Sequence, residues 1–416
     1  MCDDKIRLGN ASHLRGLFLH GRYRFHDAPN PDSTVRASER YGEEGMVHCG
    51  RDSQQYALQT EIRIRALMKE CLVGTNMPVL NIAMVGGDDL ARELAKPTDQ
   101  RDVHTYVHKE TVDGQARILS LIRPAKYPER LRPLLNALSA ARAGLIEVTA
   151  VDATLGEALV AFASAGIKYG VAVLAPPQGE WIDEDMVKAL FKQAGLSSWT
   201  FKKADGIELR SAFFGIMDAV SDLLASIEEQ PLVVPIDQHF NVKGIGLVAI
   251  GYVQSGVINV HDEVTMLPHG GTGSVKSLQV MDDDVERAGA GDRVGIALRN
   301  AKEESLSGTC LIVHPEIDDK KTNTFRPLSL ENHSVSSMQL RVSPFQKKQL
   351  AVGDVVHASI DLQFNVGRVE SSDGKTCMVR WETPLLQRID DAPDVLIAQL
   401  DSKPRIMGSA KLSKVE

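Results

Sequence analysis

The segment 231–315 carries the pattern that most constrains how this chain folds. Short runs of branched and aromatic residues alternate there with glycine-containing turns. Runs of about five to seven residues between glycines are too short for several helical turns. The predicted strands are 247–253, 257–260, 275–281 and 293–298. The segment therefore predicts a small closed antiparallel β-barrel.

This segment resembles the second domain, a β-barrel, of elongation factor Tu and its relatives among the translational GTPases. The matching residues are, in order, Gly246, 251–256, 257–264, 275–279, 290–295 and Gly308. His261 stands where the family usually has a glycine, so the resemblance leaves the conformation of this turn open. Asp292 is suited to accept hydrogen bonds from the N–H groups of its own turn. Another kind of small barrel is the alternative interpretation.

Length and composition favour a multidomain protein of the cytosol. A chain of 416 residues is long enough for roughly two to four domains. The net charge of −8 creates no general attraction to nucleic acid, so RNA binding requires a local basic patch. Five scattered cysteines without a CxxC pair fit free thiols better than disulfides or a zinc site. Because the chain has no signal peptide and no apolar run of about 18 residues, we expect a cytoplasmic monomer without membrane or DNA partners.

Residues 1–76 are predicted to form an N-terminal extension. They mix charges, histidines and prolines without a sustained period, which is typical of a flexible segment. Only 56–72 has apolar residues at helical spacing. An alternative is that the natural chain begins at Met77, just before a domain's first strand.

Residues 77–229 are predicted to form an α/β domain that begins like a nucleotide-binding domain. An apolar strand at 80–85 leads through Gly86 and Gly87 into a helix at 88–95, which is the frame of a phosphate-binding loop. The loop motif itself needs a lysine for the phosphates and a hydroxyl for Mg²⁺. Neither is present, and Asp88 and Asp89 stand where phosphate would lie and would repel it. Lys96 is a full helix length away.

The other nucleotide-contacting positions of the family also differ here. A strand at 118–122, a helix at 129–143 and a strand at 144–151 resemble the family's Asp-x-x-Gly region, yet Arg123 stands at its Asp and Lys126 at its Gly. Tyr127 stands at the histidine that positions the attacking water. The strand 169–174 runs into Ala-Pro-Pro-Gln instead of the guanine-reading Asn-Lys-x-Asp, and 198–205 replaces the turn that lines the base. The resemblance thus implies a degenerate GTPase-like domain, ending in a helix at 210–229.

An unrelated α/β enzyme is the competing interpretation of this domain. His104 and His108 are four residues apart, but no glutamate follows the first, which favours a structural role over metal binding. Asp152 with Glu157 are a candidate carboxylate pair, and so are the acidic residues 183–185, which more simply begin a helix at 185–194. No motif for a nucleophile is visible. We therefore predict no catalytic residue and no metal site.

The C-terminal segment predicts a second barrel. After the barrel domain 230–316 and a polar linker at 316–324, the domain 325–416 resembles the third domain of the same family, most closely the archaeal or selenocysteine-specific forms. Its predicted strands are 335–342, 357–364, 367–370, 376–381, 395–400 and 405–412, the last interrupted by Gly408. The turn at 351–356 repeats the Gly-Asp-x-Val turn of the first barrel.

The resemblance implies a role in translation. In the family, the nucleotide state rearranges the GTPase domain, and the barrels hold an aminoacyl-tRNA and dock on the ribosome. We therefore expect an elongation-factor-like protein without cofactor, a pseudo-GTPase, whose barrels bind tRNA, the ribosome or another translation factor. The candidate RNA contacts are Lys276, Arg293, Arg299, Lys302, Arg368, Lys375 and Arg380. The alternatives are a factor that binds GTP and Mg²⁺ through non-standard loops, and a protein-binding adaptor without RNA.

Overall fold

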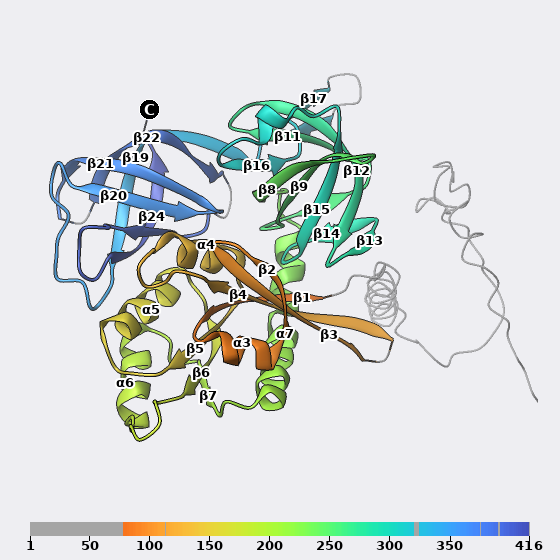
Figure 1. Ribbon diagram of the computed structural model, residues 1–416. Coiled ribbons are helices and arrows are strands. Elements are labelled where there is room, and N and C mark those ends of the chain that lie inside the picture. Colours follow the sequence, from red (N-terminus) through yellow and green to blue (C-terminus); the bar gives the residue numbers. More distant parts are fainter. Residues whose placement is uncertain (1–77, 113, 320–323, 375, 390–391, 416) are drawn as a thin grey trace, which may run out of the picture. The chain divides into compact units, whose positions relative to one another are not determined.

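The computed structural model describes residues 78–112, 114–319, 324–374, 376–389 and 392–415. An α/β domain is followed there by two closed antiparallel β-barrels, which confirms the predicted fold class (Figure 1). The predicted extension 1–76, its helix 56–72 and the alternative start at Met77 lie outside the described residues. No helix in the described part of the chain combines the length and the apolar character that crossing a membrane requires.

The α/β domain is built on a seven-stranded sheet of order β2-β3-β4-β1-β5-β6-β7. Its central strands are parallel, and the β2–β3–β4 edge is antiparallel. The strands are β1 (Val79–Val85), β2 (Lys96–Gln100), β3 (Val103–Val112), β4 (Gln115–Pro124), β5 (Ala143–Val148), β6 (Tyr169–Leu174) and β7 (Thr200–Lys202). The helices are α3 (Asp88–Leu94), α4 (Arg132–Ala140), α5 (Ala153–Ser164), α6 (Glu184–Ala194) and α7 (Gly206–Glu228).

Aspartates fix where three of these helices begin. The side chains of Asp152, Asp183 and Asp205 accept hydrogen bonds from the first N–H groups of α5, α6 and α7. The cap at Asp152 also explains why the strand predicted at 144–151 already ends at Val148. The helix predicted at 129–143 is shorter, since it begins at Arg132 and the backbone is extended from Ala141 onwards. The strands β2 and β3 and the helix α5 were not predicted.

Hydrophobic side chains cover both faces of this sheet. One cluster joins α4, α5 and α6 to one face, and a second joins α3 and α7 to the other. In the first cluster, the ring of Trp199 meets that of Phe162 edge-on at 5.2 Å between centroids. Trp199 lies directly over two strands, because a Cβ added at Gly144 or Gly170 would come within 2.3 or 2.5 Å of its ring. These glycines are therefore required by packing.

The central barrel has the closed strand order β11-β16-β8-β9-β15-β12, and β12 pairs back to β11. Its elements are β8 (Val234–Val242), β9 (Gly246–Tyr252), β10 (Val257–Asn259), β11 (Glu263–Leu267), β12 (Gly271–Val280), β13 (Asp283–Val285), β14 (Arg287–Gly289), β15 (Arg293–Arg299), the 3-10 helix η1 (Glu303–Leu306) and β16 (Cys310–Val313). The four strands predicted for this segment are all present, and their ends differ from the predicted ones by at most four residues.

The turn at His261 keeps the backbone conformation of a glycine. His261 has a φ of +76°, in the left-handed region that residues other than glycine rarely adopt. The next residue stabilises the turn, because the carboxylate of Asp262 accepts a hydrogen bond from the Asn259 N–H at 2.8 Å. The departure from the family at this position therefore changes the residue and leaves the turn in place.

The same turn occurs twice more, once in each barrel. Asp292 accepts a hydrogen bond from the Gly289 N–H at 2.8 Å, as the sequence predicts for this aspartate. In the last barrel, Asp354 accepts one from the Ala351 N–H at 3.0 Å. A glycine with positive φ precedes each aspartate. The two barrels thus use one sequence motif for one backbone geometry.

The last barrel closes in the order β19-β22-β21-β20-β23-β24. Its strands are β19 (Leu330–Val342), β20 (Val355–Ile360), β21 (Gln363–Ser372), β22 (Thr376–Arg388), β23 (Val395–Ala398) and β24 (Ile406–Lys414). The predicted linker contains two more short strands, β17 (Ile317–Asp319) and β18 (Thr324–Arg326), which pair with each other.

Two strand predictions in this barrel are wrong. The predicted strand 357–364 is divided by a two-residue hairpin turn, in which Asp361 and Leu362 have φ values of +46° and +58°. Because neither of these two positions is a glycine, nothing in the sequence indicated a turn here. Gly408 does not interrupt the last strand but forms a bulge within it, where a Cβ would lie 2.0 Å from the Arg341 carbonyl oxygen.

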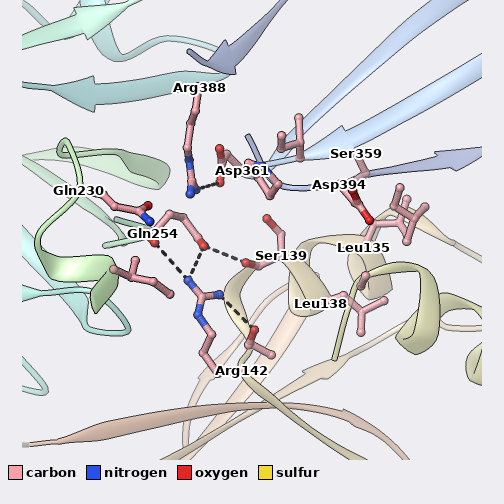
Figure 2. A pocket seen from close by; sticks show the side chains of 16 residues that line it. Leu135, Leu138, Ser139, Arg142, Gln230, Gln254, Ser359, Asp361, Arg388 and Asp394 are labelled. Carbon is pink, nitrogen blue, oxygen red and sulfur yellow. Dashed lines mark hydrogen bonds and ion pairs between the residues drawn. The ribbon is translucent and has the colours of Figure 1, made fainter. Parts of the chain in front are cut away.

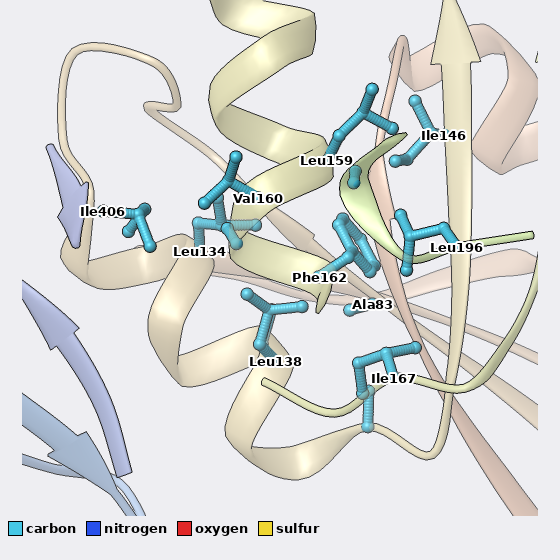
Figure 3. Packing of buried hydrophobic residues seen from close by; sticks show 14 of the residues in the cluster. Ala83, Leu134, Leu138, Ile146, Leu159, Val160, Phe162, Ile167, Leu196 and Ile406 are labelled. Carbon is cyan, nitrogen blue, oxygen red and sulfur yellow. The ribbon is translucent and has the colours of Figure 1, made fainter. Parts of the chain in front are cut away.

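Buried contacts connect the α/β domain with the last barrel. Ile406 of β24 packs beside Leu134 of α4 and Val160 of α5 in one hydrophobic cluster (Figure 3). Next to it, the guanidinium of Arg405 donates two hydrogen bonds to the carboxylate of Glu157, one of them at 2.8 Å. Both side chains of this ion pair are largely buried. Glu157 therefore forms an interdomain ion pair, and Asp152 caps the helix α5. The two residues do not form the candidate carboxylate pair.

The glycines under Trp199 generate a first prediction. Gly144→Ala forces Trp199 and Phe162 apart, and we expect it to lower the free energy of unfolding by about 1–3 kcal/mol. The matched control is Gly156→Ala in α5, where no described atom lies within 4 Å of the added Cβ. This control should raise stability by about 0.5–1 kcal/mol. Urea unfolding of both variants measures the difference, and equal stabilities would contradict the packing described here.

The buried turn at Asp292 generates a second prediction. Burial raises the pKa of Asp292 to about 7 in the folded chain, whereas an unfolded aspartate titrates near about 3.9. Between these two values the folded chain holds a proton that the unfolded chain has released, so this group lowers stability as pH rises. We therefore expect Asp292→Asn to gain stability relative to the unchanged chain from about pH 4 to about pH 7. Urea unfolding measures the difference in free energy of unfolding between Asp292→Asn and the unchanged chain. If this difference stays constant across the pH range, the raised pKa of Asp292 is disproved.

Candidate functional site at the end of strand β1

The loop between β1 and α3 is closed by a side chain of the protein itself. Gly86 and Gly87 follow β1, and Glu147 reaches them from the neighbouring strand β5. The Gly87 N–H donates a hydrogen bond to the Glu147 carboxylate at 2.5 Å. A Cβ at Gly86 would lie only 2.8 Å from the Cβ of Glu147. The glycine therefore leaves room for Glu147, and a backbone amide of the loop is bonded to a carboxylate of the chain.

Further charged groups tie the loop to its surroundings. The Arg123 guanidinium donates to the Gly86 carbonyl oxygen at 2.7 Å. Asp88 accepts hydrogen bonds from the Tyr106 hydroxyl and from Arg92. These two donors, Tyr106 first, lower the pKa of Asp88 and keep it ionised. The loop and its flanks thus form an internal network of carboxylates, guanidinium groups and backbone groups.

The remaining residues of the predicted nucleotide site do not all meet here. Asp89 lies exposed in the first turn of α3. The Tyr127 hydroxyl donates instead to the carbonyl of Thr154 at 3.2 Å, and burial raises its pKa, so that it stays protonated. Lys126 lines a hollow between the α/β domain and the central barrel, together with Tyr252. The structure therefore brings Gly86, Gly87, Asp88 and Arg123 together and places Lys126 and Tyr127 elsewhere.

Sequence reasoning missed Glu147, Tyr106 and Arg92 in this network. The sequence contains one indication that Glu147 belongs to this network. It is the single acidic residue in the otherwise apolar strand β5, one residue before the end of that strand. In a parallel sheet the carboxyl ends of neighbouring strands meet at one edge. Such a residue is therefore expected near the end of β1. Among the described residues, no group of three or more histidine, cysteine or acidic side chains is arranged to hold a metal ion.

The candidate RNA contacts of the central barrel fall into two groups. Arg299 and Lys302 are exposed at one end of β15, and Lys276 lies near them, with its ammonium donating to the Ile245 carbonyl at 2.9 Å. Arg293 lies at the other end of the strand. It forms an ion pair with Asp237 at 3.2 Å and faces the α/β domain. Only the first group shares one surface.

On the last barrel, Arg368 and Arg380 lie directly opposite each other on β21 and β22. Arg380 forms an ion pair with Glu370 at 2.5 Å. Arg368 donates to the Gly353 carbonyl oxygen at 3.0 Å. Both arginines are exposed. Lys375 lies outside the described residues.

The bond from Gly87 to Glu147 generates a third prediction. Glu147→Ala removes a charge-assisted hydrogen bond, and we expect it to lower the free energy of unfolding by about 1–2 kcal/mol. Glu147→Gln retains an acceptor and should cost less. The control Asp89→Ala, on the exposed side of α3, should stay within about 0.5 kcal/mol of the unchanged chain. If Glu147→Ala proved more stable than the unchanged chain in urea unfolding, Glu147 would not hold this loop together.

Comparisons with known proteins agree with the fold and with the central barrel. Residues 246–312 match the family model described as elongation factor Tu domain 2. An uncharacterised protein of Methanocaldococcus jannaschii is 25% identical over 337 residues, which are 81% of this chain and 100% of that protein. The selenocysteine-specific elongation factor of the same organism is 26% identical over 214 residues, which are 49% of this chain but only 45% of that factor.

A solved structure extends the similarity to all three domains. Translation elongation factor SelB from Methanococcus maripaludis, in its apo form, matches with a TM-score of 0.64. The match covers 82% of this chain and 80% of that chain, at 18% sequence identity, and so shows a shared fold. With the match of the central barrel and the similarity to the selenocysteine-specific factor, the chain is similar to the elongation factor Tu and SelB group of translational GTPases.

Proposed function

We propose that this chain is an elongation-factor-like protein that has lost GTP hydrolysis and acts through its barrels on tRNA, the ribosome or another translation factor. The observation that carries this proposal is the hydrogen bond from the Gly87 N–H to Glu147. A phosphate-binding loop offers such amides to its ligand. Here the chain's own carboxylate takes the position of that anion.

The charges around the loop support the same conclusion. Three carboxylates, those of Asp88, Asp89 and Glu147, belong to the loop or contact it. A triphosphate at this place would meet negative charge at short range, which is repulsive. The segment 86–91 has the sequence GGDDLA and supplies neither a lysine nor a hydroxyl. The two guanidinium groups that contact this segment are already engaged, Arg123 with the carbonyl of Gly86 and Arg92 with Asp88.

Contacts within the chain support the same proposal. The ion pair between Arg405 and Glu157 and the contacts of Ile406 connect the last barrel to α4 and α5. Residues of the chain itself make these contacts. The exposed surfaces of the barrels are the ones that we propose bind a partner.

A fourth prediction tests both parts of this proposal. Titration with a fluorescent GTP analogue and Mg²⁺ should show no saturable binding, whereas a nucleotide-binding SelB protein in the same assay serves as the positive control. Co-sedimentation with ribosomes should be independent of GTP. It should weaken steeply between low and moderate salt, because contacts with phosphates release counterions.

The variants identify the binding surface. Arg299→Glu and Arg368→Glu should each reduce co-sedimentation, since they reverse the charge of exposed arginines without an ion-pair partner among the described residues on the two barrels. The control Lys188→Glu on α6 should not. Micromolar, Mg²⁺-dependent GTP binding would overturn the loss of the nucleotide site. Ribosome binding that ignores both salt and the two barrel variants, or no binding at all, would instead favour a protein-binding adaptor.

A further inference from the structure

A cavity of about 300 Å³ lies where α4, the central barrel and the last barrel meet. Its wall combines apolar side chains of α4, such as Leu135 and Leu138, with polar groups from both barrels (Figure 2). A volume of this size is at the lower end of the range of small-molecule sites. It is separate from the loop at the end of β1 and from the exposed barrel surfaces.

Arg142 is the central charged group of this cavity. Its guanidinium donates to three oxygens, all of them uncharged: the carbonyls of Ala141 and Gln254 and the side-chain oxygen of Gln254, the last at 2.8 Å. Gln254 is itself held in place by its bond to the Ser139 carbonyl at 2.7 Å. Among the described residues, Arg142 has no carboxylate bonded to it. A partly buried cation with only neutral partners is costly, and an anion beside it would lower that cost.

A second guanidinium also lines the cavity, but it is paired with a carboxylate. Arg388 lines the opposite wall and forms an ion pair with Asp361 at 2.7 Å, in which both side chains are largely buried. The other carboxylate of the wall, Asp394, is paired outward with Arg341 and Lys411. The wall thus contains two guanidinium groups and two carboxylates, and Arg142 is the one of these four groups without an ion-pair partner among the described residues.

We propose that this cavity is a binding site for a small anion with a carboxylate or phosphate group, which Arg142 recognises. The planar guanidinium suits both groups, because its N–H donors match their paired oxygens. The apolar side of the wall accommodates a short carbon skeleton. Burial and the nearby charge of Arg388 lower the pKa of Arg142 to about 10, so its guanidinium stays charged at neutral pH. This inference is independent of the proposed function.

The position of the site gives the anion a structural effect. Ser139 and Arg142 belong to the α/β domain, Gln254 to the central barrel, and Asp361 to the last one. Ser139 also accepts a hydrogen bond from the Leu362 N–H at 3.0 Å. A ligand bound to Arg142 would therefore stabilise all three domains in their present arrangement. Binding to the folded form alone raises stability by RT ln(1 + [L]/Kd).

A fifth prediction tests the site with inorganic phosphate and with malonate, each at constant ionic strength adjusted with chloride. We expect at least one of them to raise the thermal unfolding temperature in a saturable manner. Arg142→Gln should weaken this binding at least tenfold. Asp361→Asn should strengthen it several-fold, because it removes the carboxylate that offsets the positive charge. The control Lys188→Gln, on the exposed side of α6, should bind as the unchanged chain does.

The pattern across the variants decides the outcome. Stabilisation by phosphate alone identifies a phosphate ligand, and stabilisation by malonate alone identifies a carboxylate. No saturable effect of either anion, or an equal effect on Arg142→Gln and the unchanged chain, overturns the proposal. Isothermal titration of Asp361→Asn provides a second measurement, which does not depend on the folding of Arg142→Gln. Weaker binding by Asp361→Asn than by the unchanged chain contradicts the proposed charge balance.

Discussion

A buried ion pair between Glu157 and Arg405 connects two domains of this protein. It joins α5 of the α/β domain to the segment just before β24 of the last barrel. Arg405 also donates to the Pro128 carbonyl at 2.8 Å, so one side chain fixes two segments of the α/β domain. A substitution that removes one partner is costly, because the remaining charge would lie buried without a partner. Two residues of the chain itself make this interdomain contact.

The loop at the end of β1 follows the same principle. A site that binds a phosphate leaves backbone amides without partners until the ligand arrives. Here the Gly87 amide is bonded to Glu147, the Gly86 carbonyl to Arg123, and Asp88 to Tyr106. These groups come from β5, β4 and β3, so the sheet itself supplies the partners. The segment 86–91 contains neither a lysine nor a hydroxyl group, and its internal hydrogen bonds are consistent with that composition.

The sequence was informative where backbone geometry depends on a single residue type. Glycines with positive φ marked the corners of the central barrel, and an aspartate begins α6 close to where it was predicted. The turn at Asp361 and Leu362 was missed, because neither residue type usually adopts positive φ.

Only part of the candidate site could be predicted from the sequence. The chain order alone identifies Gly86 and Gly87 as the loop after β1. Glu147 lies sixty positions further on in sequence, and only the pairing of β1 with β5 brings it to Gly87. Tyr127, placed by alignment in the same site, points instead to the carbonyl of Thr154. Contacts that depend on strand order and side-chain direction were therefore beyond prediction from one sequence.

The distribution of unpaired charge favours the barrels as the surfaces that meet a partner. Arg368 and Arg380 lie directly opposite each other, and like charges in that position destabilise a sheet. Glu370 neutralises only Arg380, so Arg368 keeps its charge. On the central barrel, Arg299 and Lys302 form no ion pair within the described residues. These exposed cations are the residues that the proposed contact of the barrels with a polyanion such as RNA would use.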